Sequence, residues 1–450
     1  MEVIKQRPHL HKDWIDPHAY GIVKALQKAN FTTYLVGGCV RDLLLNIHPK
    51  DYDIATKAHP PQVKRLIYMS FIIGKRFRLV LVKRDEQQFE VATFRRDLTE
   101  DEVAERAAAV EVAEDETIEA PAPTLPTGDN IFGEPEEDAK RRDFTINALF
   151  YDPIADQILD YVGGMDDIQK RVLRMIGDPN KRLIEDPIRI LRGLRFAHKA
   201  GFSLDPELRE AMQTHASSLI KSVLPRKREE ILKILRLERP DLALIEAYDL
   251  GLLEFVLPTL HTLFADVAKK ELFFANFRAF HRLADNSAGT VNLFGWLLFS
   301  YFRTIIEEPT HEQSDQLAQD EDIRRIMREE LGMFNHEQSA VSRALEIIPY
   351  LGRWLDFKRR GPRRQFAMLK NEGFPLALQM AEVDYIFGAE VLQFWREAFS
   401  AAREELAQLG EERSGRIRPN RPNRSNNRRR RNDRRPPRKD KANNDVGPAE

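Results

Sequence analysis

The chain has 450 residues, 42% of them hydrophobic and 31% charged, an ordinary composition for a folded protein that is long enough for more than one core. No run of about 18 apolar residues lacks charges, and the start MEVIKQRPHLHKD has no apolar signal core, so we expect a cytoplasmic protein without a membrane span. The single cysteine, Cys39, excludes an internal disulfide, and no Cys/His cluster has zinc-ligand spacing.

Residues 31–96 predict a mixed α/β unit. A β-branched and aromatic run, FTTYLV, ends at a glycine pair and is followed by a helix pattern, VRDLLLNI. A second extended run, DYDIAT, comes next. The runs RFRLVLV and QFEVATF, separated by KRDEQ, predict a hairpin of two long strands.

Residues 97–129 contain 11 acids and one base, with Ala and Pro interspersed. This composition cannot bury enough apolar surface to offset its ordering entropy, so we expect a disordered insertion. Order is expected to resume at DNIFG, followed by short strands and turns in DFTINALFY, QILDYVGG and VLRMIGD.

Beyond about residue 178 the pattern is helical as far as about Leu409. In DPIRILRGLRFAHKAGF we expect Asp186 as the N-cap, Pro187 at the first helical position and Gly201 as the stop. The tail has no core-forming residues, and Arg413 to Lys441 carry 14 basic and 2 acidic residues, about +12, although the whole chain has a net charge of −1. Such a tail is expected to bind RNA phosphates; a solubilising or partner-binding tail is the alternative.

Three acidic residues are candidates for a metal site. Asp51 and Asp53 lie two residues apart in the expected strand DYDIAT, so their carboxylates face the same side. Hard oxygen ligands suit Mg²⁺, and two such ions can clamp the attacking and leaving oxygens of a phosphoryl group. Glu90 lies on the polar face of QFEVATF and could complete the site. The alternatives are a solvated strand end and an exposed strand glutamate.

Three further segments carry residues suited to a nucleotide. Gly37 and Gly38 form a strand-to-helix turn that lets backbone N–H groups approach a phosphate, and Arg41 could add a charged fork, although a plain tight turn is the alternative. The cluster Arg141, Arg142 and Asp143 could bind a triphosphate or ribose, or form a salt-bridged helix end. Asp186 and Arg189 could read the donor and acceptor edges of a base, or form an ordinary ion pair within one helix.

The chain resembles the class II nucleotidyltransferases, the family of tRNA CCA-adding enzymes and bacterial poly(A) polymerases. Five segments carry the resemblance, in this order: VGGCVRDLLL, PKDYDIAT, EVATFRR, DAKRRDFTINALFYD and EDPIRILRGLRFA. The resemblance covers residues 31–260 well and the later helices loosely. It implies an α+β fold, with a DNA polymerase β-like nucleotidyltransferase head, an all-helical neck and body, and a disordered Arg-rich tail.

The resemblance also implies roles for the candidate residues. Asp51 and Asp53 become metal ligands for two Mg²⁺ ions, and Glu90 matches the third acidic strand position, with Asp143 as its rival for an essential carboxylate. Four groups would bind the nucleotide: Gly37, Gly38 and Arg41 at the triphosphate, Arg141, Arg142 and Asp143 at triphosphate and ribose, and Asp186 and Arg189 at the base. The expected domains are the head (18–152, with its insertion at 97–129), neck (153–260), body (261–409) and tail (410–450).

Within the family, three features favour a poly(A) polymerase that uses ATP on RNA 3′ ends: the strand IIGKRFRLVLV, the DNIFG before the Arg-Arg-Asp cluster, and the basic tail. Two features depart from that pattern: Leu81, where a histidine is expected, and the acidic insertion. CCA addition to tRNA and a catalytically silent RNA-binding adaptor are the alternatives. Polyadenylation is expected to mark RNA for decay, with RNA-decay or RNA-chaperone proteins as partners. Six tail residues are predicted RNA contacts: Arg428, Arg429, Arg430, Arg431, Arg434 and Arg435.

Overall fold

The computed structural model describes residues 4–6, 10–74, 78–97, 131–282, 289–305, 321–384 and 387–415. The chain falls into two compact units, residues 1–397 and 398–450. The expected disordered insertion, apart from its first residue, and the expected tail from residue 416 onward lie outside the described residues. None of the described helices is both long and apolar enough to cross a bilayer.

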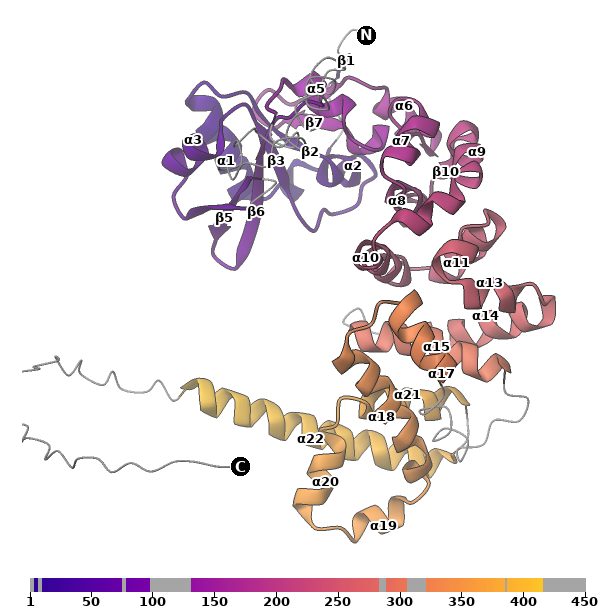
Figure 1. Ribbon diagram of the computed structural model, residues 1–450. Coiled ribbons are helices and arrows are strands. Elements are labelled where there is room, and N and C mark those ends of the chain that lie inside the picture. The colour runs from indigo at the N-terminus through magenta and orange to yellow at the C-terminus, as the bar shows by residue number, and fades with distance from the viewer. Residues whose placement is uncertain are drawn as a thin grey trace, which may run out of the picture. The chain divides into compact units, whose positions relative to one another are not determined.

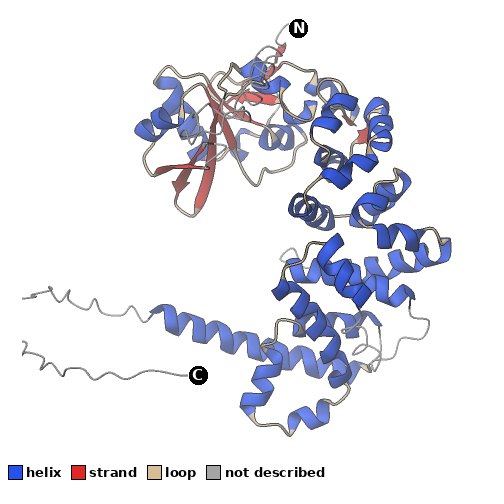
Figure 2. Cartoon of the chain, in the orientation of Figure 1, coloured by secondary structure: helices blue, strands red, loops and turns tan. Residues whose placement is uncertain are grey.

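The N-terminal part of the first unit is built on an eight-stranded mixed sheet with strand order β1-β8-β7-β2-β3-β6-β5-β4 (Figures 1 and 2). Neighbouring strands are antiparallel except β3 and β6, which run parallel. The strands are β1 Ile4–Gln6, β2 Thr33–Val36, β3 Asp53–Thr56, β4 Ser70–Ile73, β5 Leu79–Arg84, β6 Gln87–Thr93, β7 Leu149–Asp152 and β8 Gln157–Asp160. Helical segments among them are η1 Lys12–Trp14, α1 Pro17–Lys28, α2 Gly38–Leu44, α3 Pro60–Leu66, α5 Pro135–Lys140 and η3 Thr145–Asn147.

Local sequence explains why these elements form. Helix α1 begins where the Asp16 carboxylate accepts the backbone N–H groups of His18 (2.7 Å) and Ala19 (3.1 Å), which is an N-cap. The predicted hairpin is confirmed as β5 and β6. In β6, Phe89 and Val91 are buried and Glu90 is exposed, as strict alternation requires. The mixed α/β prediction for this part of the chain is therefore confirmed.

Backbone hydrogen bonds join the chain on the two sides of residues 98–130. Arg95 and Phe132 form an antiparallel bridge. The Arg96 N–H donates to the Ile131 carbonyl at 3.1 Å, and the Gly133 N–H donates to the Phe94 carbonyl at 2.9 Å. The chain therefore leaves the end of β6 and returns beside it.

The rest of the first unit is helical, apart from the two-stranded parallel pair β9 Val172–Leu173 and β10 Ser203–Leu204, so the expected change from a mixed to a helical fold is confirmed (Figure 2). Helix α15 carries a buried aromatic set that includes Phe294, Trp296 and Phe299. The helices are α6 Gly164–Lys170, α7 Pro179–Glu185, α8 Ile188–Ala200, α9 Pro206–Thr214, η4 Ala216–Lys221, α10 Leu224–Leu235, α11 Pro240–Asp249, α12 Leu253–Val256, α13 Pro258–Phe264, α14 Val267–Arg282, α15 Thr290–Ile305, α17 Glu321–Arg325, η6 Ile326–Glu330 (a π-helix), α18 Asn335–Leu351, α19 Trp354–Lys358, α20 Pro362–Leu369, α21 Phe374–Asp384 and α22 Ala389–Gly415. Helix α22 continues past Leu409 and through residues 398–415 of the second unit.

The ends of α8 test two sequence predictions. The stop at Gly201 is confirmed, because this residue has a left-handed φ of +65° at the C-cap. The prediction that Asp186 is the N-cap is wrong: Pro187 holds that position, and Asp186 is the C-cap of α7. A residue before proline is restricted to extended backbone, and the Asp186 carboxylate binds a side chain instead of the helix end.

Candidate nucleotide and metal site

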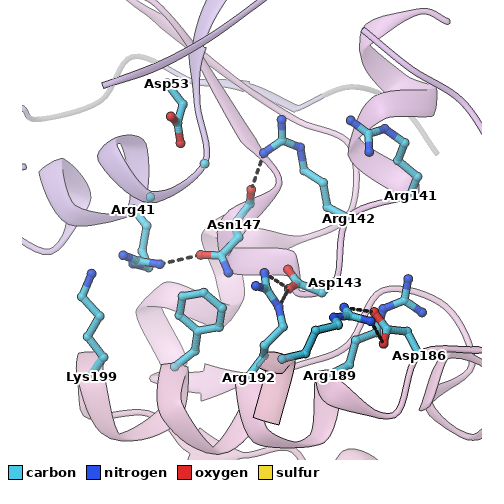
Figure 3. Close-up of a pocket in the computed structure, with 14 residues that line it drawn as sticks. Arg41, Asp53, Arg141, Arg142, Asp143, Asn147, Asp186, Arg189, Arg192 and Lys199 are labelled. Atoms are coloured by element: carbon cyan, nitrogen blue, oxygen red, sulfur yellow. Dashed lines mark hydrogen bonds and ion pairs between the residues drawn. The ribbon is translucent and has the colours of Figure 1, made fainter. Parts of the chain in front are cut away.

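A cavity of about 550 Å³ lies where the glycine turn after β2, the segment after α5, and helices α8 and α10 meet (Figure 3). Its lining has seven cationic side chains against three carboxylates, so it suits a polyanionic ligand such as a triphosphate. The lining residues are Gly37, Gly38, Arg41, Asp53, Arg141, Arg142, Asp143, Asn147, Asp186, Arg189, Arg192, Phe196, Lys199 and Arg226.

The glycine turn brings backbone close to this cavity. Gly37 has φ +76° and ψ −130°, a conformation that only glycine adopts without strain. A Cβ added there would lie 3.3 Å from Nη1 of Arg142. Arg41, buried in α2, donates to Oδ1 of Asn147 at 2.5 Å and to Asp42. The turn and the start of α2 therefore lie beside two guanidinium groups at one side of the cavity.

Two of the three candidate metal ligands are strand neighbours. Asp53 is the first residue of β3 and pairs in parallel register with Glu90 of β6. Asp51 precedes the strand, is exposed, and lines a second cavity of about 490 Å³. Burial raises the pKa of Asp53, the charges of Glu90 and Asp51 raise it further, and Arg142 partly offsets them. The three carboxylates therefore repel one another, and a cation among them would relieve that repulsion.

The donor set is compatible with Mg²⁺ but does not form a closed cage. Within the described residues, no group of three or more His, Cys, Asp or Glu side chains is placed to hold a metal ion by itself. Mg²⁺ commonly binds one or two carboxylates together with substrate phosphates and water. Asp53 supplies such oxygens in the lining of the cation-rich cavity, whereas Asp51, two residues earlier, lines the neighbouring cavity of about 490 Å³.

Asp138 of α5 positions two of the lining arginines. Its buried carboxylate accepts from Arg141 at 2.5 and 2.9 Å, from Arg142 at 2.9 and 3.2 Å, and from the Arg95 N–H at 3.1 Å. Burial favours the neutral acid, but the two guanidinium groups outweigh it and lower the pKa of Asp138. Sequence reasoning named the two arginines and missed the carboxylate that holds them.

Asp143, which follows α5, links the part of the chain that carries the eight-stranded sheet to helix α8. Its Oδ2 accepts from Arg192 at 2.6 and 2.9 Å, and Arg192 also lies 4.0 Å from Glu230. Glu230 in turn accepts from Arg195 at 2.7 Å. Asp143 is therefore engaged with α8, whereas Glu90 lies beside Asp53.

Asp186 and Arg189 line the cavity but do not pair with each other. Asp186 accepts a two-pronged contact from Arg226 of α10, at 2.8 and 2.9 Å. Arg189 donates to Glu185 at 3.0 Å and to the Arg182 carbonyl at 2.8 Å. Asp186 thus binds a cation of another helix in place of the alternative ion pair within one helix, and both Asp186 and Arg189 line the cavity (Figure 3).

Several lining residues had no signal in the sequence. Asn147, Phe196 and Lys199 belong to motifs that looked structural, and Arg226 lies about 40 positions beyond its partner Asp186. Arg192 follows Arg189 by three residues, a spacing that many exposed helices share. The six predicted tail arginines, 428–431, 434 and 435, lie outside the described residues.

The chain is similar to proteins of one family. The family model described as "Poly A polymerase head domain" matches residues 33–174, and that described as "Probable RNA and SrmB- binding site of polymerase A" matches residues 201–264. Poly(A) polymerase I of Haemophilus influenzae is 32% identical over 375 residues, which cover 81% of this chain and 74% of that protein.

Other relatives match over shorter stretches. Poly(A) polymerase I of Salmonella typhi is 40% identical over 244 residues, 52% of this chain and 49% of that protein. A CCA-adding enzyme of Lactobacillus helveticus is 35% identical over 216 residues, 48% of this chain and 49% of that protein. The chain thus spans about half the length of these two relatives. A CCA-adding enzyme of Bacillus stearothermophilus, solved in complex with CTP, shares the fold with a TM-score of 0.55 and 24% identity, covering 86% of this chain and 83% of that chain.

Proposed function

The chain belongs to the nucleotidyltransferase family that contains bacterial poly(A) polymerases and CCA-adding enzymes, and we propose that it adds AMP from ATP to RNA 3′ ends without a template. The observation that carries this proposal is Asp53, which lines a cavity with seven cations and pairs in register with Glu90 of the neighbouring strand. An acid at a cavity suited to phosphate, with a second acid on the next strand, is suited to nucleotidyl transfer.

In the proposed reaction, an RNA 3′-hydroxyl attacks the α-phosphate of ATP in line, and pyrophosphate leaves. Arg41, Arg141, Arg142 and Arg192 bind and orient the triphosphate, and the Gly37–Gly38 turn brings backbone N–H groups to it. Asp143 accepts a hydrogen bond from the ribose or keeps Arg192 in position. Catalysis by these groups consists of orientation and charge stabilisation, without a covalent enzyme intermediate.

We assign Asp51 and Asp53 as the ligands of two Mg²⁺ ions, with Glu90 as the third acid of the site. When bound, Mg²⁺ lowers the hydroxyl pKa and stabilises the leaving pyrophosphate. The assignment is testable without turnover: MgCl₂ should raise the melting temperature of the wild type and leave that of Asp53→Asn unchanged, because a ligand stabilises only the form that binds it. Equal stabilisation of both proteins would remove the assignment.

Base selection is assigned to Asp186 and Arg189. A carboxylate accepts from the amino group of adenine, and a guanidinium donates to the neighbouring ring nitrogen; guanine and uracil present the opposite pattern. Cytosine presents the same pair of groups as adenine. This shared edge, together with the similarity to CCA-adding enzymes, makes CCA addition to tRNA the second candidate function.

One assay separates the candidates. The purified chain is incubated with Mg²⁺, either an unstructured RNA or a tRNA lacking its CCA end, and each nucleoside triphosphate alone or CTP with ATP. Long tails on both RNAs with ATP alone support polyadenylation. Extension of the tRNA by three nucleotides, with CTP required, identifies a CCA-adding enzyme. No extension under any condition leaves the RNA-binding adaptor.

The remaining expectations belong to the same proposal. The division into head (18–152), neck (153–260), body (261–409) and tail (410–450) follows the family pattern, with the tail binding RNA phosphates. Proteins of RNA decay or RNA chaperones are proposed partners, and the cytoplasm is the proposed location. Deletion after Leu409 should weaken RNA binding and reduce its dependence on salt.

A further inference from the structure

Helices α19 and α20 present a dense set of exposed cations outside the cavity described above (orange in Figure 1). Residues 353–370 contain seven basic side chains and one acid, Asp356. All seven basic side chains are exposed. We call this set the α19–α20 basic surface: Arg353, Lys358, Arg359, Arg360, Arg363, Arg364 and Lys370.

These exposed cations differ from cations elsewhere in the chain that stabilise the fold through buried ion pairs. Arg228 is buried and donates to Glu337 at 2.6 Å, and Arg195 donates to Glu230 at 2.7 Å. On the α19–α20 basic surface, by contrast, the ion pair present among the described residues is Arg359 with Asp356, at 3.9 Å and with both side chains largely exposed. Like charges collected without carboxylate partners repel one another, and a polyanionic ligand would relieve that repulsion.

Aromatic rings lie between the cations. The Lys358 ammonium lies 4.1 Å from the ring centroid of Trp354 and 4.9 Å from that of Phe394, and the Arg353 guanidinium lies 5.7 Å from that of Tyr350. Tyr350 is 45% exposed. Sequence-tolerant binding of single-stranded nucleic acid combines cations that follow the phosphates with rings on which bases stack.

A concavity borders this surface. A cavity of about 620 Å³ lies between α18 and the end of α20, and its lining includes Lys370 of the basic surface together with His336 and Arg343. Glu372 is the acidic residue of that lining. At Lys370, the basic surface therefore borders a hollow that can receive part of a ligand.

We propose that the α19–α20 basic surface is a second RNA-binding surface, which holds the phosphate backbone of the substrate RNA upstream of its 3′ end. It lies outside both segments that match family models, 33–174 and 201–264, and outside the Arg-rich tail. The inference rests on the proposed function for the identity of the polyanion. Binding there is independent of base sequence and depends on the length of the RNA.

RNA explains the surface better than a membrane or an acidic protein. A membrane-binding surface needs several apolar side chains that insert into the bilayer, whereas the large apolar side chain exposed within residues 353–370 is Leu355, at 56%. Relatives of this chain are poly(A) polymerases, whose substrate is a long polyanion, so RNA is favoured over an acidic protein.

The test compares two full-length variants with equal loss of charge. The first, R360Q/R363Q/R364Q, removes three cations from the basic surface, and the control, K28Q/K64Q/R65Q, removes three exposed cations from α1 and α3. Fluorescence anisotropy measures the binding of a long unstructured RNA at several KCl concentrations. Because each single-strand phosphate contact contributes about 0.7 to the slope of log K against log salt, we expect the slope to fall by about 2 in the first variant and to change little in the control.

Two further measurements make the result decisive. Extension of a short oligoadenylate should be equal in the wild type and both variants, while the KM for the long RNA rises only in R360Q/R363Q/R364Q. Equal slopes in the two variants, or binding of this surface to phosphatidylglycerol vesicles in place of RNA, would overturn the inference. RNA binding and RNA extension are measured separately. A chain that binds RNA in this way but extends no RNA would refute the proposed function and still support RNA binding at the α19–α20 basic surface.

Discussion

Replacing Asp138 by Asn should loosen one wall of the nucleotide cavity while changing a single atom. The wild-type carboxylate accepts five hydrogen bonds, four from Arg141 and Arg142 and one from the Arg95 N–H. An amide has one oxygen in place of two, and its NH₂ group points a donor at one guanidinium. Several charge-assisted bonds are therefore lost together.

The size of the effect follows from burial. Removing one partner of a buried ion pair costs about 3–5 kcal/mol, because the remaining charge is left without compensation. Here the side chains of Arg141 and Arg142 are 28% and 22% exposed, so water recovers part of the loss, and we expect about 3 kcal/mol. The variant also gains net positive charge near the proposed triphosphate site, which would favour triphosphate binding by about 1 kcal/mol or less in a water-filled cavity. The loss of two fixed guanidinium groups has the larger, opposite effect on that binding.

Hydrogen exchange measured by mass spectrometry gives the local readout, because a chain of this size does not unfold in two states. Peptides covering α5 should exchange more than a hundredfold faster in Asp138→Asn, which corresponds to about 3 kcal/mol. The matched control is Glu136→Gln on the same helix, whose ion pair with Lys140 is exposed and should leave exchange unchanged. Equal exchange and equal KM for ATP in the two variants would refute the reasoning.

The same carboxylate sets a pH dependence. Because its folded pKa lies below the unfolded value of about 3.9, Asp138 stabilises the fold above about pH 4, and this contribution is lost as pH falls through the folded pKa. The stability difference between wild type and Asp138→Asn should thus be constant from pH 6 to 8 and shrink below about pH 4. A difference that grew on acidification would contradict this account.

Three other substitutions test separate features. Gly37→Ala should destabilise the chain by about 1–3 kcal/mol, because φ at this residue is +76°, and should raise the KM for ATP because the new Cβ displaces Arg142. Gly21→Ala is the control, since a Cβ there meets open space. Equal KM values in the two variants would be contrary evidence. Asp53→Asn should abolish extension and yet raise the melting temperature at neutral pH without Mg²⁺. The pKa of Asp53 is raised in the folded chain, so ionisation of this carboxyl opposes folding above that pKa, and Asn removes the ionisation. A lower melting temperature of the variant would contradict this account. Asp160→Asn should speed hydrogen exchange in peptides that cover the start of α6 by about thirtyfold, or about 2 kcal/mol, because the Asp160 carboxylate accepts four backbone N–H groups. Exposed Asp166→Asn should have no effect, and similar exchange in the two variants would argue against this role of Asp160.

Features set by local pattern were predictable from the sequence. Alternation placed Glu90 on the polar face of its strand, and the glycine pair between an apolar run and a helix gave the turn that Gly37 makes with φ +76°. Gly201 ended its helix as expected. Each of these depends on backbone preferences or on side-chain periodicity within a few residues.

Features set by distant pairing were not predictable. The parallel register of Asp53 with Glu90 depends on a crossover through α3 and the β4–β5 hairpin, and periodicity contains no information on register between separate strands. Asp186 looked like a helix cap because capping residues commonly precede a helical pattern, but its carboxylate accepts from Arg226 of another helix. Asp138 resembled any acid in a charged helix until its burial was known.

The bridge between Arg95 and Phe132 also brings two points of the chain together that are far apart in the sequence. Because these two points lie side by side, a Gly-Ser linker that replaces residues 98–130 has only a short distance to span, and each doubling of its length costs about 0.6 kcal/mol of closure entropy. A fluorescent reporter or an affinity module placed in such a linker would leave both termini of the chain unaltered.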